Sequence, residues 1–269
     1  MKKTRELTEQ IEIQAPIAAV WKALTEAEEL TRWFPLEAKV TPGTGGSIWM
    51  SWRNEYQFEW RIDEWIPNRH LRTGYEQPML LQENLRTGSP QPMVVDYHLE
   101  SRGNKTVLRL VHSGFSLHSN WDELYDGTRR GWQTCLWILQ HYLEHHLGKP
   151  RDMIYLRNII PRLSREESWH RLVSACGGEN ALGGQKPGRY CIRAGECTLE
   201  GIVKALHPPK DFTGTVENLN HALLRIHFDD LFGRRDVSFE LCTYGLPTEQ
   251  IQTIEKEWAR LLNHIFETE

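Results

Sequence analysis

The chain has 269 residues, of which 39% are hydrophobic and 25% charged, and its formal net charge is −4. This length exceeds the commonest size of one domain and fits two, and the composition is that of a folded globular protein. Positive and negative residues are interspersed, and Lys and Arg cluster only as short doublets. The charge pattern therefore argues against a nucleic-acid partner.

The sequence also argues against secretion and membrane insertion. No apolar stretch follows the positive N-terminus, and no window approaches the ~18 apolar residues of a membrane span. The five cysteines are odd in number and contain no C-x-x-C pair, which predicts neither a disulfide framework nor a zinc knuckle. We therefore expect a cytoplasmic protein with reduced thiols, no metal and no cofactor.

The first half of the chain predicts a strand, two short helices and then about six antiparallel strands. Ile11-Glu-Ile13 alternates as a strand, Pro16 takes the favoured first position of a helix, and a second helix ends near Pro35. A glycine-rich turn at 42–46 then leads into the sheet. Residues 56–62 alternate strictly between apolar and polar, which is typical of a sheet with one wet face.

The longest predicted element is a helix over about 120–147. At 100° per residue, one apolar stripe contains Trp132, Cys135, Leu136, Leu139, Leu143 and Leu147. Such a stripe needs an apolar surface, and the one-sided sheet provides it. The expected fold class is α+β, with a curved antiparallel sheet around a long C-terminal helix.

Several segments of the first 150 residues occur in the order seen in one known superfamily. They are Ile11-Glu-Ile-Gln-Ala-Pro16 with Val20-Trp21, Trp33-Phe-Pro35, Gly45-Gly46, His112-Ser-Gly-Phe115 and Gly131-Trp132. Together they resemble the START-like (SRPBCC), helix-grip superfamily of the birch pollen allergen type. Within it they are most similar to domains homologous to the activator of the heat-shock-protein-90 ATPase. The resemblance implies a gap between sheet and helix that is often a ligand cavity.

We interpret residues 151–269 as a shortened second copy of the domain in residues 1–150. Two segments carry this interpretation: Glu167–Leu172 resembles Val20–Leu24, and Phe239–Leu246 resembles Leu108–Phe115. A terminal helix follows the second segment in both halves. The two segments lie closer together in the second half, which predicts that this copy has lost part of the sheet or a loop.

Two motifs of catalytic type are interpreted as structural. His141-Tyr-Leu-Glu144-His145 matches H-x-x-E-H, in which two histidines can share a metal ion. On the helix wheel these residues lie opposite the apolar stripe, and no third ligand is evident, so we expect a solvated face. Gly43–Gly46 leads into a strand and no Lys-Ser/Thr follows, so we expect a turn and not a phosphate cradle.

The tryptophans indicate where a ligand would bind. Nine of the eleven precede residue 150, and the inward face of the predicted sheet is rich in aromatic residues. The candidate ligand-binding residues are Trp52, Tyr56, Phe58, Trp60, Glu64, Tyr97, Leu108, Leu110 and His112 from the sheet, with Leu139 from the long helix. These rings either line a cavity or fill the gap completely, and aromatic bulk suits both.

Three functions stay open from the sequence. The first is binding of a small apolar or aromatic ligand, with Tyr97, His112 and Glu64 orienting its polar end. The second is a protein-interaction module that contacts a chaperone or a second copy of the chain. The third is a cyclase- or aromatase-like enzyme that uses His112 as an acid or base. A void above ~300 Å³ with His112 at its wall would support binding, and a filled core would favour interaction.

Overall fold

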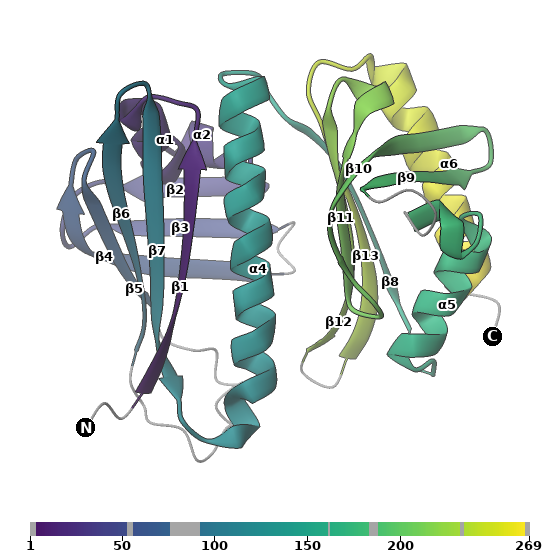
Figure 1. Ribbon diagram of the computed structural model, residues 1–269, viewed down its shortest axis with the longest axis horizontal. Helices are drawn as coiled ribbons and strands as arrows, with labels where there is room; N and C mark the ends of the chain where they lie inside the picture. Colours follow the sequence, from purple (N-terminus) through teal and green to yellow (C-terminus); the bar gives the residue numbers. More distant parts are fainter. Residues whose placement is uncertain are drawn as a thin grey trace. The chain divides into compact units, whose positions relative to one another are not determined.

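The computed structural model describes residues 4–52, 56–75, 92–160, 162–182, 188–231 and 234–266. The chain forms two compact units, Met1–Gly148 and Lys149–Glu269. Each unit contains an antiparallel sheet followed by a long helix, shown in Figure 1. No helix within the described ranges is long and apolar enough to cross a membrane.

The first unit follows the predicted order of elements. Its strands are β1 (Thr4–Ile13), β2 (Glu37–Thr41), β3 (Ser47–Trp52), β4 (Tyr56–Ile66), β5 (His70–Tyr75), β6 (Met93–Arg102) and β7 (Lys105–Ser116). Helices α1 (Ile17–Thr25) and α2 (Ala27–Thr31) lie between β1 and β2, and α4 (Asp122–His141) follows β7. The strands form one antiparallel sheet in the order β1-β7-β6-β5-β4-β3-β2.

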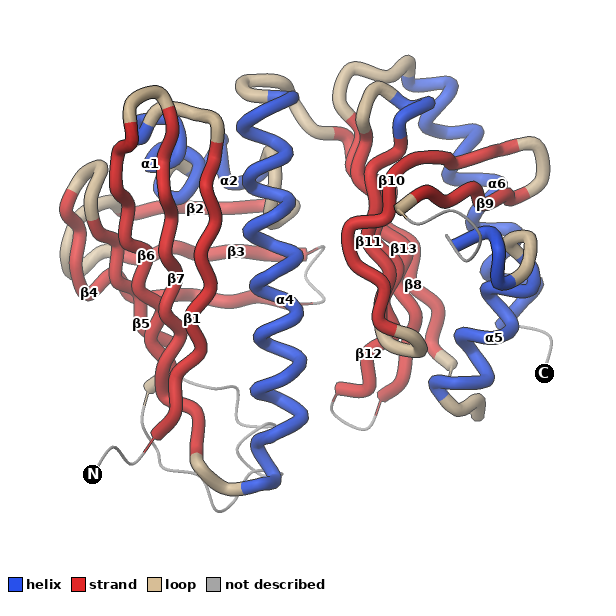
Figure 2. The backbone as a smooth tube through the Cα atoms, in the orientation of Figure 1, coloured by secondary structure: helices blue, strands red, loops and turns tan. Residues whose placement is uncertain are grey.

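Helix α4 runs beside the edge strand β1, as Figure 2 shows. Its polar side chains bind that strand directly: Arg129 and Gln133 both donate to Glu9, at 3.0 and 3.1 Å. Gln140 donates to the carbonyl of Glu12 at 2.9 Å. These bonds fix the helix along the sheet and cover an edge that would otherwise invite pairing with another strand.

The apolar stripe of the long helix is confirmed up to Leu143. Trp132, Leu136, Leu139 and Leu143 are buried, whereas Leu147 is 50% exposed. The helix ends in one π turn, Tyr142–His146, so a fixed rotation of 100° per residue no longer describes its last turn.

The solvated face predicted for the H-x-x-E-H motif is wrong at His141, which is 5% exposed. Its ring packs against that of Trp137, with centroids 5.7 Å apart. Glu144 accepts a hydrogen bond from the backbone N–H of Gln14 at 2.8 Å, and only His145 of the three is exposed.

The second unit repeats the topology with one strand fewer. It contains β8 (Asp152–Ile159), α5 (Arg165–Ala175), β9 (Arg189–Ala194), β10 (Cys197–His207), β11 (Asp211–Val216), β12 (Ala222–Leu231), β13 (Arg234–Thr243) and α6 (Thr248–Phe266). The sheet order is β8-β13-β12-β11-β10-β9. In both units the first strand pairs with the last, and the others follow in reverse order. The predicted fold class, a helix-grip domain followed by a shortened copy, is therefore confirmed.

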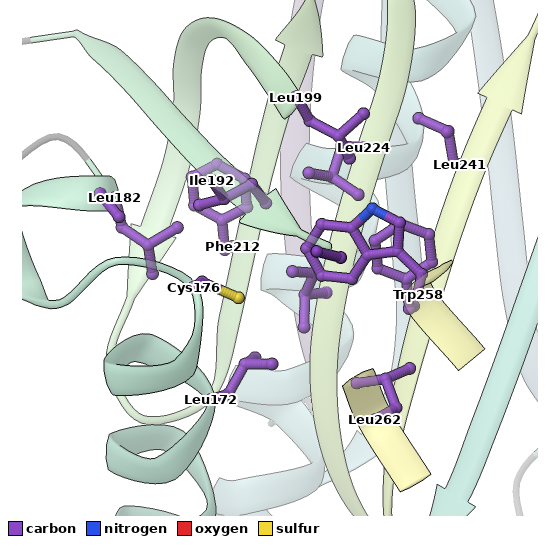
Figure 3. Close-up of a cluster of buried hydrophobic side chains, with 14 of the residues drawn as sticks. Leu172, Cys176, Leu182, Ile192, Leu199, Phe212, Leu224, Leu241, Trp258 and Leu262 are labelled. Carbon is purple, nitrogen blue, oxygen red and sulfur yellow. The ribbon is translucent and has the colours of Figure 1, made fainter. Parts of the chain in front are cut away.

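The interior of the second unit is filled by apolar side chains from every layer. Figure 3 shows Leu172 from α5, Phe212 and Leu224 from the sheet, and Trp258 from α6 gathered in one cluster. Trp258 is fully buried and stacks on Phe239, with ring centroids 4.4 Å apart. The narrow gap between α5 and the sheet has no room for a water molecule.

Candidate functional site

A cavity of about 250 Å³ lies inside the first unit, between the sheet and α4, and is partly open to solvent. Its wall is almost entirely apolar and aromatic. It is lined by Phe34, Met50, Trp52, Phe58, Trp60, Tyr75, His112, Thr128, Gly131, Trp132 and Cys135. The volume is slightly below the ~300 Å³ expected of a typical ligand pocket, but the gap is not filled.

Strand alternation and helix periodicity bring these side chains together. Residues two apart on a strand share a face, which places Phe58 and Trp60 of β4 beside Met50 and Trp52 of β3. From α4 the cavity is lined by residues at positions 128, 131, 132 and 135, which lie on one face of a helix. Gly131 leaves the middle of that face open, because a Cβ atom there would meet nothing within 4 Å.

The aromatic rings of the wall contact one another. Trp60 stacks on Tyr75, with centroids 5.4 Å apart and an interplanar angle of 14°. Trp52 meets Phe34 and Phe58 edge to face, at 5.3 and 6.0 Å. Such contacts hold the rings in fixed positions, so the cavity has a defined shape.

His112 joins two other residues of the cavity wall by hydrogen bonds. The indole Nε1–H of Trp132 donates to His112 Nδ1 at 2.8 Å, and His112 Nε2 lies 3.1 Å from the hydroxyl oxygen of Tyr75. Both ring nitrogens are therefore engaged. Burial lowers the pKa of His112 from 6.5 to about 3. The hydrogen bond from Trp132 also requires a neutral ring, because its indole N–H needs a lone pair on Nδ1. His112 is neutral.

This neutral histidine predicts a loss of stability in acid. The unfolded chain takes up a proton near pH 6.5 that the folded protein takes up only near pH 3. The contribution of His112 to the free energy of unfolding is therefore complete above pH 6.5. It is lost as the pH falls towards 3, by about 1.4 kcal/mol per pH unit. We expect urea unfolding at pH 7.5, 5.5 and 4.5 to show this slope relative to a His112→Gln variant. Glutamine can accept from Trp132 and donate to Tyr75 but does not titrate, so parallel profiles would contradict the prediction.

The structure brings four of the predicted site residues to the cavity: Trp52, Phe58, Trp60 and His112. Tyr97 and Trp60 line a separate hollow of about 20 Å³. Leu108, Leu110 and Leu139 are fully buried in the core and do not line the cavity. Tyr56 belongs to β4, but its side chain lies outside the described residues.

Glu64 lies on the opposite face of the sheet from the other predicted residues. The pairing of β4 with β5 shifts register between Ile62 and Glu64, and such a bulge reverses the faces beyond it. Trp65 consequently takes the inward position, against Trp21. Glu64 pairs with His70 Nδ1 at 3.0 Å.

On the same outer face, His70, Asp96 and His98 bring possible metal-ligand atoms within 4.8 Å of one another. These groups already have partners: His70 Nε2 lies 2.8 Å from Asp96 Oδ1, and Arg72 donates to both oxygens of Asp96 at 3.2 Å. The rings of His70 and His98 are stacked. The cluster is a network of ion pairs and hydrogen bonds across β4, β5 and β6.

Sequence reasoning missed Phe34, Met50, Tyr75, Thr128, Gly131, Trp132 and Cys135 as residues of the cavity wall. A signal existed for Tyr75, since Leu71, Thr73 and Tyr75 alternate with the outward His70 and Arg72. For the α4 residues, the signal was their spacing along the helix next to Trp132.

The described geometry defines a class of protein: two domains in tandem, each with an antiparallel sheet closed by a long C-terminal helix in the helix-grip arrangement. Residues 14–144 match the family described as activator of Hsp90 ATPase homolog 1-like protein. This match covers most of the first unit and confirms the resemblance predicted from the sequence.

Three solved structures are among those similar to this chain. The Aha1 dimer from Colwellia psychrerythraea is 20% identical over 54% of this chain and 99% of its own, with a TM-score of 0.45. The di-domain ARO/CYC protein BexL, from the BE-7585A biosynthetic pathway, is 14% identical over 98% of this chain and 99% of its own, with a TM-score of 0.46. DynU16, from the dynemicin biosynthetic locus, is 19% identical over 97% and 96%, with a TM-score of 0.43. No curated protein matches the sequence.

Proposed function

We propose that the first unit binds a small, largely apolar aromatic molecule in the cavity between its sheet and α4. The observation that carries the proposal is the aromatic wall of a partly open space of about 250 Å³. A compact molecule of two or three fused rings suits this volume. Burial of its apolar surface would supply the affinity, at roughly 25 cal/mol per Å².

The fixed positions of the wall support binding without a large rearrangement. The rings already contact one another, so little side-chain freedom would be lost when a ligand enters, and that loss is a main cost of association. Among the described residues, no lysine, arginine, aspartate or glutamate lines the cavity. A charged ligand would therefore lose its hydration without gaining a partner, which favours a neutral one.

Thermal unfolding with a panel of flavonoids, aromatic polyketides and lipids tests this proposal. A ligand at a hundred times its dissociation constant adds about 2.7 kcal/mol to the free energy of unfolding. For a unit of this size that corresponds to a rise in melting temperature of about 5–10 °C. We expect such a rise with neutral aromatic members of the panel. The absence of any shift, with a solubilised compound in excess, would count against a binding function.

The second candidate function is interaction with a chaperone, and the match of residues 14–144 to the ATPase-activator family supports it. Its test is direct titration of purified Hsp90 with the full chain, followed by binding and by ATP hydrolysis. Saturable binding that a cavity ligand does not affect would place interaction ahead of ligand binding. A homodimer contact would appear, in analytical ultracentrifugation of the chain alone, as a molar mass that depends on concentration.

The geometry of His112 argues against a direct catalytic role for this residue. Both of its nitrogens are engaged within the wall, so direct acid or base catalysis would require at least one of these bonds to break. This observation ranks ligand binding above a cyclase- or aromatase-like reaction.

A further inference from the structure

We propose that the ligand presents a neutral oxygen acceptor, the carbonyl of an aromatic ketone or quinone, to the hydroxyl of Tyr75. In this arrangement His112 is a positioning residue that leaves the proton of that hydroxyl free to point into the cavity. The inference rests on the proposed ligand-binding function and specifies the chemistry that the cavity selects.

The directions of the two hydrogen bonds of His112 follow from Trp132, whose indole N–H can donate but not accept. An indole nitrogen only donates, so Trp132 Nε1–H, 2.8 Å from His112 Nδ1, requires an unprotonated Nδ1. A neutral imidazole then carries its proton on Nε2. That Nε2–H, 3.1 Å from the Tyr75 oxygen, donates to it. The tyrosine hydroxyl accepts from His112 and cannot donate back to it.

The proton of Tyr75 is left without an acceptor among the described residues. Tyr75 lines the cavity, and its hydroxyl accepts a hydrogen bond from His112. The ring that stacks on Tyr75 also has an unpaired donor, since Trp60 Nε1 is buried without a hydrogen-bond partner. Thr128 adds a hydroxyl that can either donate or accept. Tyr75 and Trp60 therefore each leave one donor without an acceptor among the described residues.

The ligand that corrects this imbalance carries an acceptor and no charge. A hydrocarbon would cover the Tyr75 hydroxyl and leave its proton unpaired, which disfavours its binding. A carboxylate would meet no cation among the described residues that line the cavity. A conjugated carbonyl on a planar ring system satisfies the donor and matches the aromatic walls.

Fluorene and 9-fluorenone form a matched pair of probes, since they share one tricyclic skeleton and differ by a CH₂ and a C=O group. Equilibrium dialysis with the full chain is expected to show fluorenone binding about fivefold more tightly, the usual worth of one neutral hydrogen bond. In a Tyr75→Phe variant the ratio of the two affinities should fall to about one. Tyr125→Phe is the control, because that hydroxyl donates to the carbonyl of Glu6 at 3.1 Å and does not line the cavity.

His112 variants and NMR test the positioning role separately. His112→Gln can reproduce both hydrogen bonds and should keep the preference for fluorenone, whereas His112→Leu should lower it. Long-range ¹H–¹⁵N spectra are expected to show an unprotonated Nδ1 and a protonated Nε2 on His112 at pH 7.

The outcomes separate the role of Tyr75 from ligand binding itself. Equal affinities for the two probes in the wild type, or the opposite histidine tautomer, would overturn the role of Tyr75 and leave ligand binding intact. Failure of both probes and of the whole panel to bind would overturn the proposed function, and this inference with it.

Discussion

A Gly131→Leu variant is expected to lose ligand binding and to gain stability. Gly131 lines the cavity in the middle of α4, and a Cβ atom there would meet nothing within 4 Å. A leucine side chain can therefore extend from this position towards the cavity and occupy part of its 250 Å³. We expect the affinity for any cavity ligand to fall at least about tenfold, as for steric exclusion worth about 1.4 kcal/mol or more.

The expected gain in stability of Gly131→Leu comes from helix propensity and not from the cavity. It therefore shows that a loss of binding is not caused by unfolding. Glycine inside a helix is about 0.8–1 kcal/mol less favourable than a good helix former, so the leucine should raise the free energy of unfolding by about that amount. Gly127→Leu is the matched control: it lies one turn earlier on α4 and does not line the cavity. It should give the helix gain and keep ligand binding. A Gly131→Leu protein that binds as well as the wild type would show that the ligand lies elsewhere.

The parts of the site that the sequence predicted are those governed by strict alternation. Phe58 and Trp60 share a face because a strand has a period of two, and the opposite strand β3 places Trp52 beside them. The same rule placed His112 inward on β7, where it is 2% exposed. Local periodicity was sufficient for these residues because each strand segment that carries them is regular.

The sequence failed where local geometry departs from regularity. The bulge after Ile62 turned Glu64 outward, and the π turn after His141 changed which residues of the last helical turn are buried. Neither feature has a reliable signature in one sequence. Tyr75 was missed for a different reason: its role depends on contacts with His112 and Trp60, which come from distant parts of the chain.

Whether a helix-grip interior is hollow or filled could not be predicted either, because it depends on the sum of side-chain volumes. The first unit has more tryptophans yet contains the cavity, whereas apolar side chains pack the described core of the second, which has few. Gly131 explains part of this difference, since it removes volume where α4 faces the sheet. Trp258 of α6 does the reverse and fills the interior of the second unit.

Trp258→Ala is accordingly expected to destabilise the second unit strongly. The indole is fully buried against Phe239, and replacing such a side chain by alanine leaves a cavity that costs about 3–5 kcal/mol. Equilibrium urea unfolding, followed by circular dichroism, measures the loss.

Two variants serve as controls for the Trp258 prediction. Trp258→Phe should cost far less than alanine, because it keeps an aromatic ring on Phe239 and removes a buried N–H that has no acceptor. Trp169→Ala, at a half-buried ring that meets Phe228 edge to face, should cost about 1–2 kcal/mol by the smaller apolar area it exposes. A loss below about 1 kcal/mol for Trp258→Ala would mean that α6 is not packed on the sheet as described. Binding of fluorenone should survive in the folded alanine variant, because Trp258 does not line the cavity.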